Sequence, residues 1–476
     1  PDRGYINDIK ADLFDENTAY LALDNHKNGD YKPYLYMTTN KGKSWKCISS
    51  NIPENNYVWR IVQDHINPKL LFVGTEFGLY FTVDGGEHWK QIKSGVPTIS
   101  FRDLAIQRRE NDLVAASFGR SIYILDDYSF LRDLTPELVE KDAAMLALRN
   151  AYLYTPVNDG RGKDGYLGSQ EYVAENPEYG AVFTYYLKGE QTLKTAERTK
   201  KEKELNKAGT DIDFAGWDVL LAEKNEIKEQ HWVVITDVEN KVVRKMQVPS
   251  GKGLHRFTWD FSAENAMPIN TGEKLNENKN GGFRVGPGTY RITLYYVHQG
   301  KATPLTTPKS FDVIPLYPGT LPSKNDGVKN TFIAQYVAVS SRKSLLEYDF
   351  NQAKKQASAM ELALKRSPNS LGALESELVD LTNELRNLDL LLEGNPLKDE
   401  VGEKNIPTIN ERIWAASSAL WGGNGYGPTT TAQQSLDIAE RMLADFDAKL
   451  AVIKLKAATI YEELKKSGAP VIRGME

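Results

Sequence analysis

The spacing of apolar residues divides this chain into a β-rich part followed by a helical part. Up to about residue 316, apolar positions form short runs bounded by turn residues, and several runs alternate with polar positions, as in 181–187 and 290–296. Such runs are typical of strands. From 371 to 392 and from 446 to 464, apolar residues instead recur at intervals of three and four, which indicates amphipathic helices. The pattern therefore predicts a multidomain protein.

A short turn motif occurs twice near the N-terminus. Residues 38–45 read Thr-Thr-Asn-Lys-Gly-Lys-Ser-Trp, and residues 82–89 read Thr-Val-Asp-Gly-Gly-Glu-His-Trp. The interval between the copies is that of a four-stranded propeller blade, about 40–50 residues. A second echo aligns 76–80 with 117–123 if a short insertion is allowed. The repeat predicts that residues 1–126 are blades of a β-propeller.

Each copy of the motif has a physical reason to form a turn. The Asn or Asp side chain can accept hydrogen bonds from backbone N–H groups of its own turn, and the glycine that follows can adopt a positive φ. The tryptophan at the end of the motif is expected to pack over the turn. This is the Asp-box pattern, Ser/Thr-x-Asp/Asn-x-Gly-x-x-Trp, and its structural residues here are Asn40, Gly42, Trp45, Asp84, Gly86 and Trp89.

The predicted blades cannot close a ring by themselves. They cover about 5–53, 57–97 and 99–126, whereas propellers typically have about four to eight blades. An unclosed propeller would leave apolar strand edges uncovered. We therefore expect the missing N-terminal blades to lie upstream of Pro1, on the same or a cleaved polypeptide, and to be a partner of this chain.

The remainder of the chain is expected to form further domains. Strand signals over 151–316, mostly without helical patterns between them, predict an antiparallel β-sandwich of immunoglobulin or fibronectin type III kind. Inside it, the Lys/Glu-rich stretch at about 188–230 predicts a solvated helical insertion. A helix starting at Pro136 is expected to continue through 143–146. The other predicted segments are a helical connector, a proline-rich linker and an antiparallel α-helical bundle, over 127–150, 317–328 and 329–476.

Two stretches carry a resemblance to a known family. Residues 59–89, with the second Asp-box, and residues 108–127 resemble bacterial BNR/Asp-box repeat proteins related to the sortilin propeller family. The likeness is to the C-terminal part of large members often labelled glycosyl hydrolase-like, in which a sandwich and a helical tail follow the propeller. It implies a secreted, periplasmic or outer-membrane-associated protein of a Gram-negative bacterium. Relatives usually have Thr-His-Gly-Arg where this chain has residues 117–120, so Phe118 replaces a histidine.

The candidate ligand-binding residues lie on the predicted innermost strands. The resemblance implies that the Asp-boxes occupy outer turns, away from the central channel. An aromatic ring beside guanidinium groups can stack on a sugar or hold an acidic peptide end. The plainer alternative, which the sequence alone favours, is a set of buried Arg–Asp pairs that tie neighbouring blades together. The channel-facing candidates are Trp59, Arg60, Glu76, Arg102, Asp103 and Arg120.

The composition of the chain argues against several classes of partner. The net charge of −5 gives no general attraction to nucleic acid, and no apolar run is long enough to span a membrane. Cys47 is the single cysteine, so no internal disulfide can form. The six histidines show no metal-pair spacing and no HExxH motif. We therefore expect no nucleic-acid partner, no metal and no cofactor.

Two functions remain open on the sequence. The first is a non-catalytic, extracytoplasmic propeller that binds a protein, peptide or glycan as a scaffold. The second is the C-terminal part of a secreted glycoside hydrolase, sialidase-like or another BNR-repeat hydrolase, whose catalytic residues lie mostly upstream. No catalytic residue can be assigned in this chain. A pair of facing carboxylates about 5–9.5 Å apart would favour the hydrolase.

Overall fold

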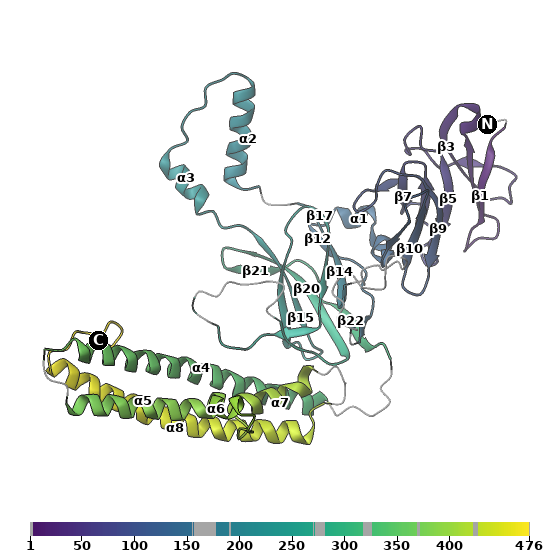
Figure 1. Ribbon diagram of the computed structural model, residues 1–476. Helices are drawn as coiled ribbons and strands as arrows, with labels where there is room; N and C mark the ends of the chain where they lie inside the picture. The colour runs from purple at the N-terminus through teal and green to yellow at the C-terminus, as the bar shows by residue number, and fades with distance from the viewer. Residues whose placement is uncertain are drawn as a thin grey trace. The chain divides into compact units, whose positions relative to one another are not determined.

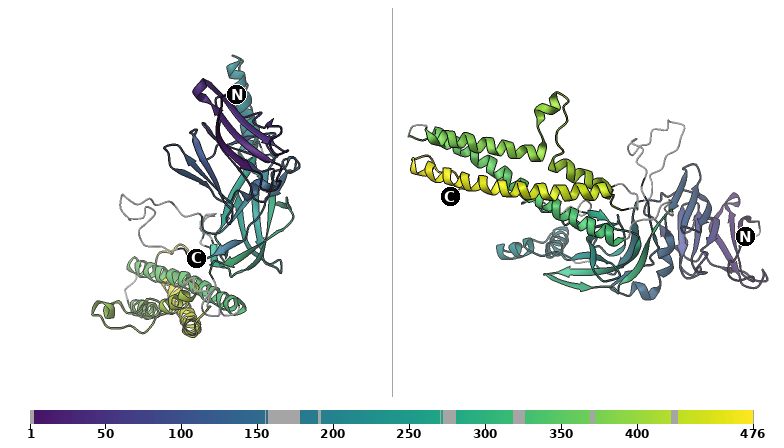
Figure 2. Two further views of the ribbon diagram at one scale, coloured as in Figure 1. Left: turned by 90° about the vertical axis from the view of Figure 1, so that its right-hand side faces the viewer. Right: turned by 90° about the horizontal axis from the view of Figure 1, so that it is seen from below.

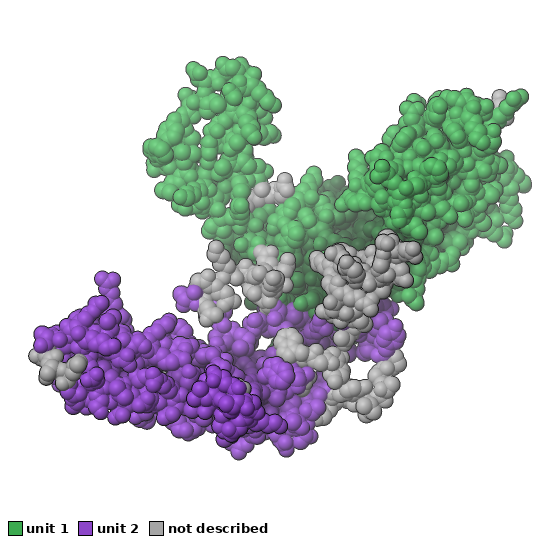
Figure 3. Space-filling model, in the orientation of Figure 1, with its two compact units in different colours: residues 1–151, 158–260, 289–313 green, residues 152–157, 261–288, 314–476 purple. Residues whose placement is uncertain are grey.

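A computed structural model supplies the structure of this chain (Figure 1). Its described residues form several small antiparallel sheets followed by a helical region, which agrees with the hydrophobic pattern. They divide into two compact units, coloured separately in Figure 3. Unit 1 comprises residues 1–151, 158–260 and 289–313, and unit 2 comprises residues 152–157, 261–288 and 314–476. The structure describes residues 3–154, 156, 178–189, 192–269, 271, 281–317, 326–368, 372–421 and 427–475.

Residues 5–125 form three small sheets whose strand order follows the chain. Neighbouring strands pair antiparallel, as in a meander. The first sheet contains β1 (Tyr5–Ala11), β2 (Ala19–Asn25), β3 (Asp30–Thr38) and β4 (Lys46–Cys47). The second contains β5 (Val58–Gln63), β6 (Leu71–Thr75), β7 (Gly78–Thr82) and β8 (Lys90–Ile92). The third contains β9 (Phe101–Gln107), β10 (Asp112–Ser117) and β11 (Ile122–Leu125).

The first strands of these sheets, β1, β5 and β9, lie side by side (Figure 1). The Asn7 side chain donates to the Val58 carbonyl oxygen near the start of β5, and the Leu13 N–H donates to Gln63 Oε1 at its end. β1 and β5 therefore run in the same direction. A Cβ added to Gly74 of β6 would lie 2.6 Å from the Phe101 carbonyl oxygen, so the second and third sheets approach each other where only glycine fits.

The segment after the third sheet is less helical than the sequence suggested. Helix α1 covers only Pro136–Val139, with the Thr135 hydroxyl accepting from the Leu138 N–H as its N-cap. Residues Ala143–Met145 form strand β12, which pairs with β14. The expected continuation of the helix is wrong here, because these three residues are buried and pair with the partner strand.

Two further sheets follow. One has the order β12, β14, β17, and the other has the order β13, β22, β20, β15, β16, with β21 paired to β20. Phe183 of β14 and Trp259 of β17 both pack edge-on against Phe311 of β22, so aromatic side chains join the two sheets. Their strands are β13 (Ala151–Leu153), β14 (Ala181–Leu187), β15 (Gln230–Thr236), β16 (Val242–Val248), β17 (Gly253–Trp259), β20 (Gly288–His298), β21 (Lys301–Pro304) and β22 (Lys309–Pro315).

The charged insertion forms a helical hairpin of α2 (Lys194–Lys207) and α3 (Trp217–Lys224). Arg198 of α2 donates to both carboxylate oxygens of Glu223 in α3 at 2.9 and 3.0 Å, and also binds Glu202. No residue of α2 is buried. The ion pairs of Arg198, rather than an apolar core, therefore hold this hairpin together.

The C-terminal helices share one apolar core. They are α4 (Asp326–Lys365), α5 (Ala373–Glu393), α6 (Pro396–Glu400), α7 (Ile409–Trp421) and α8 (Thr430–Lys466). α4, α5 and α8 run alongside one another (Figure 2), and the leucines of α5 that recur at intervals of three and four are buried between them. Helix α4 begins inside the predicted linker, of which 318–325 lies outside the described residues.

Unit 2 also contains two short strands that the sequence placed in the sandwich region. They are β18 (Ser262–Glu264) and β19 (Gly281–Arg284), which pair with each other. The Phe283 ring meets Tyr336 of α4 edge-on, with ring centroids 5.3 Å apart. The segment 261–288 therefore belongs with the helices, which the strand pattern could not indicate.

Candidate functional site

The three N-terminal sheets have two chemically different ends. Strand register places the starts of β1, β5 and β9 at the same end as the β2–β3, β6–β7 and β10–β11 turns. This end carries Tyr31, Tyr57, Trp59, Phe77 and Phe118, and we call it the aromatic end. The two Asp-box turns lie at the opposite end, which we call the Asp-box end. Five of the six candidate binding residues meet near the aromatic end.

Trp59, Glu76 and Arg102 form one cluster from three different segments. The Trp59 indole N–H donates to Glu76 Oε2 at 2.9 Å. The Arg102 guanidinium carbon lies 3.6 Å from the centroid of the Trp59 ring, and Arg102 Nη2 is 3.8 Å from Glu76 Oε2. The same guanidinium lies 4.8 Å from the centroid of the Phe118 ring. Arg102 is therefore placed between two aromatic rings, with its charge balanced by Glu76.

Arg60 has the structural role that the sequence offered as the plainer alternative. Its guanidinium forms ion pairs with Asp8 of β1 at 3.2 Å and with Asp103 of β9 at 2.8 Å. Asp8 is buried and also accepts from the Ile61 N–H. Removing one partner of a buried ion pair leaves an uncompensated charge. Arg60 is therefore better suited to joining the three sheets than to binding a ligand, which would have to displace Asp8 or Asp103.

Arg120 is not part of this cluster. It lies exposed in the turn between β10 and β11. Among the residues that the structure describes, no ion pair and no side-chain hydrogen bond joins Arg120 to a partner. Arg120 is therefore an exposed cation at the edge of the aromatic end, without a partner among the described residues.

The binding residues predicted from the sequence did not include the aromatic residues that surround Trp59. The Tyr57 ring stacks on His26, with centroids 5.0 Å apart, and meets Trp59 edge-on at 5.2 Å. Tyr31 lies 6.4 Å from Tyr57. Burial, together with the nearby Glu76 carboxylate, raises the pKa of Tyr57 to about 12. Phe77 and Phe118 could have been found from the sequence, because they occupy equivalent places in the repeat; His26 and Asp8 carry no such signal.

At the Asp-box end, the motif residues bond to their own turns. Asn40 Oδ1 accepts from the Ser44 N–H at 2.9 Å, and the Thr38 hydroxyl accepts from the Gly42 N–H at 3.0 Å. In the second copy, Asp84 Oδ1 accepts from the N–H groups of Glu87 and His88, each at 3.0 Å. Gly42 and Gly86 have φ of 83° and 99°, which side chains other than glycine rarely adopt.

The tryptophans of the two Asp-boxes differ in burial. Trp89 is 4% exposed, and its indole N–H donates to the carbonyl oxygen of Ile48 at the end of the first sheet. Trp45 is 38% exposed. Among the described residues no sheet precedes the first one, so Trp45 has no neighbour equivalent to Ile48. The motif sets the turn, and a preceding sheet completes the burial of its tryptophan.

Asp64, also at the Asp-box end, anchors the segment that follows the third sheet. It is fully buried and accepts two hydrogen bonds from Arg132, at 2.7 and 2.9 Å, and one from the Tyr128 hydroxyl at 2.7 Å. Burial by itself would raise the pKa of Asp64. The hydrogen bonds from Arg132, the Asn67 N–H and Tyr128 outweigh that effect and lower it to about 2.

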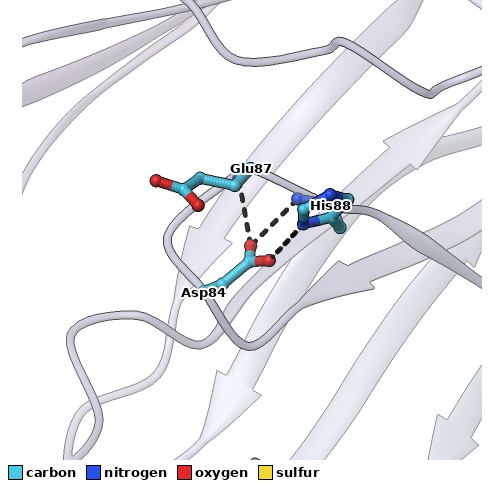
Figure 4. A group of neighbouring side chains, drawn as sticks. All are labelled: Asp84, Glu87 and His88. Carbon is cyan, nitrogen blue, oxygen red and sulfur yellow. Dashed lines mark hydrogen bonds and ion pairs between the residues drawn. The ribbon is translucent and has the colours of Figure 1, made fainter. Parts of the chain in front are cut away.

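Three potential metal ligands gather in the second Asp-box, although histidine spacing had suggested none. Figure 4 shows Asp84, Glu87 and His88, whose ligand atoms lie within 4.8 Å of one another. The Asp84 carboxylate already accepts from the Thr82 hydroxyl, two backbone N–H groups and the His88 ring. Burial opposes ionisation, but these bonds lower the pKa of Asp84 to about 2. Since a cation would compete with them, the geometry assigns this carboxylate to the turn.

Comparisons with known proteins give structural likenesses only. No protein-family model and no curated protein sequence matches this chain. An ancestral GH74 enzyme shares 19% identity over 31% of this chain and 22% of its own, with a TM-score of 0.22. The extracellular domain of BT4673 from B. thetaiotaomicron shares 13% over 66% of this chain and 31% of its own, with a TM-score of 0.20.

The GH74 xyloglucanase from Xanthomonas campestris shares 12% identity over 63% of this chain and 38% of its own, with a TM-score of 0.21. The chain thus spans well under half the length of each of these three proteins. At these TM-scores the likenesses carry no argument about function. As for membranes, no helix in the described ranges is both long enough and apolar enough to cross one.

Proposed function

We propose that this chain is an extracytoplasmic, non-catalytic binding or scaffold protein, which recognises a protein, peptide or glycan at the aromatic end of consecutive β-propeller blades. The observation that carries the proposal is the placement of Arg102 between Trp59 and Phe118, with Glu76 beside it. The cluster combines aromatic rings, a guanidinium group and a carboxylate within a few ångströms. Such a mixture of flat apolar surfaces and directional polar groups is what ligand recognition uses.

The open flanks of the three sheets support the proposal that further blades complete the ring. On β1, Ile6 and Ile9 are exposed; on β11, Ile122 and Ile124 are exposed. Edge strands with several exposed apolar residues need cover in a stable protein. Blades supplied by the upstream polypeptide would cover both flanks and would give Trp45 the neighbour that Trp89 already has. In the same proposal, the two aromatic-packed sheets form a sandwich, and the sandwich and the helical bundle stabilise the propeller or dock it to a partner.

A glycoside hydrolase is the second candidate, because Tyr57 lies beside Glu76 and a sialidase-like enzyme needs a tyrosine nucleophile paired with a glutamate. The environment of the pair opposes that role. A nucleophile is activated by a lowered pKa or by an adjacent base, whereas the pKa of Tyr57 is raised to about 12. Glu76 already accepts from the Trp59 indole. We therefore favour binding over hydrolysis.

The experiment is a comparison of the intact chain with its Trp59→Ala and Arg102→Ala variants on printed arrays of peptides and glycans. The proposal expects binding to a narrow group of related ligands, weakened at least about tenfold in both variants. The matched control is Trp45→Ala at the Asp-box end, which should bind as the wild type does. Release of new reducing ends from a bound glycan, abolished by Glu76→Gln, would instead establish the hydrolase.

A further inference from the structure

Phe77 and Phe118 are repeated, exposed platforms at the aromatic end. They occupy equivalent turns, between β6 and β7 and between β10 and β11, and each is followed by a glycine with positive φ. The Phe77 side chain is 44% exposed and that of Phe118 is 70% exposed. Exposed phenylalanines recurring in successive sheets are not required by the fold of the turns, because the glycines set the backbone there.

Both turns are held in place by the segment that leads into the first strand of the same sheet. The Phe77 N–H donates to Asn56 Oδ1 at 2.9 Å, and the Phe118 N–H donates to the Ser100 carbonyl oxygen at 2.8 Å. Asn56 is itself fixed by a hydrogen bond to the buried Tyr80 hydroxyl. The two rings are therefore presented from anchored backbone, which reduces the entropy lost when a ligand binds.

Most charged groups beside these rings are paired with one another. Arg60 is paired with Asp8 and Asp103, and Arg102 is paired with Glu76. The cluster thus contains three carboxylates and two guanidinium groups. The Asp103 side chain is 62% exposed and remains able to accept hydrogen bonds from a ligand. Arg120 adds a third guanidinium group at the same end, so these six groups carry no net charge and favour an uncharged ligand.

We propose that the aromatic end binds an uncharged linear glycan that runs across the second and third sheets, with separate sugar rings stacked on Phe77 and Phe118. This inference rests on the proposed binding function and names its ligand class. The apolar C–H face of a sugar ring suits a flat phenyl ring, and its hydroxyl groups suit carboxylate acceptors such as Asp103 and Glu76. Because the platforms lie on different sheets, a linear glycan can place a separate sugar on each.

The test uses the intact chain and a glycan array that holds neutral linear glycans of increasing length, uronic-acid glycans, sulfated glycans and peptides. Affinity for neutral glycans should rise with length until both platforms are covered. Phe77→Ala and Phe118→Ala should each weaken binding of the longer glycans about threefold to tenfold. Phe118→Tyr, which keeps a ring, should retain binding.

The matched control is Phe14→Ala, because Phe14 is 49% exposed but follows β1 at the Asp-box end. It should leave affinity unchanged. Equal affinity for short and long glycans, or equal loss in the Phe14 variant, would overturn the inference. Binding restricted to acidic glycans or peptides, and lost in Phe118→Ala, would overturn the ligand class while leaving the binding function intact. Absence of any ligand that depends on the aromatic end would overturn both.

Discussion

The two ends of the N-terminal sheets use polar residues in different ways. In the Asp-box turns, polar side chains bond to the backbone of the same turn, so a short sequence is sufficient to build them. At the aromatic end, Arg60 and Arg102 bond to residues of other sheets or turns, and large rings remain exposed. The difference indicates that the Asp-box turns are built by local contacts, whereas the aromatic end joins the sheets through Arg60 and leaves large rings exposed beside that contact.

The largest expected effect separates the two Asp-box tryptophans. Trp89→Ala should lower the local free energy of unfolding of the second sheet by about 3–5 kcal/mol, because it empties a buried site and loses the bond to Ile48. Trp45→Ala should cost roughly 1 kcal/mol in the first sheet, because its ring is already partly exposed. Native-state hydrogen exchange of the strand amides measures both values. Equal losses would contradict the role assigned to the preceding sheet.

A smaller effect is expected from the carboxylate that organises the second turn. Asp84→Ala removes the acceptor for two backbone N–H groups, the Thr82 hydroxyl and the His88 ring, and should cost about 2–3 kcal/mol. Asp84→Asn should cost about 1 kcal/mol or less, since Asn40 performs the same task in the first copy. Urea denaturation followed by tryptophan fluorescence reports the difference. A large loss in the Asn variant would mean that charge, not hydrogen bonding, is essential there.

This division also explains how much the sequence could predict. The Asp-box turns, the strands before and after them and the leucine stripe of α5 follow from local pattern, and the structure shows them. The pattern Thr430-x-x-Gln433 resembles a capping box and predicts the N-cap of the last helix at Thr430. Its N-cap is instead Thr429, whose hydroxyl accepts from the Ala432 N–H. Adjacent threonines offer the same hydroxyl, so the sequence cannot choose between them.

The aromatic end was harder to predict because its contacts join distant residues. Trp59 and Arg102 were identified from their place on the innermost strands, but nothing near Arg60 in the sequence indicates that Asp8 is its partner. Strand β12 was missed for a related reason. Ala-Ala-Met has good helix propensity, and pairing with residues of β14 that lie forty or more positions later overrides it. Tertiary contacts decided each of these cases.

The next effect in size is a loss in the free energy of unfolding on acidification, which arises at the Asp-box end. The pKa of Asp64 is about 2 when folded, below its ordinary value of 3.8. A carboxyl group whose pKa is lowered in the folded state stabilises the fold at pH values above its pKa in the unfolded chain. The contribution of Asp64 is therefore present at pH 5 and is lost as the pH falls from about 4 to 2. The expected loss is roughly 2 kcal/mol from Asp64. Urea denaturation at a series of pH values measures it, and Asp64→Asn should reduce the slope, leaving the part that comes from Asp84, whose pKa is also about 2. No change in slope would contradict the Arg132 pairing.

The smallest stability effect is expected for the exposed Phe118 ring at the aromatic end. Phe118→Ala should change the free energy of unfolding by no more than about 0.5 kcal/mol, because the ring is 70% exposed. Arg60→Met is the contrasting variant in the same region. It leaves the buried Asp8 without its partner and should cost about 3 kcal/mol or more. Thermal unfolding of both variants shows whether the exposed ring of Phe118 can be removed without loss of stability while the ion pair of Arg60 cannot.

The most direct test of the central claim is a hydrogen–deuterium exchange footprint of the intact chain with a ligand found on the arrays. The account predicts slower exchange in the turns at 76–78 and 117–121 and at the starts of β5 and β9. It predicts unchanged exchange in the Asp-box turns at 38–45 and 82–89. Protection centred on the Asp-box turns, with the aromatic end unaffected, would contradict it.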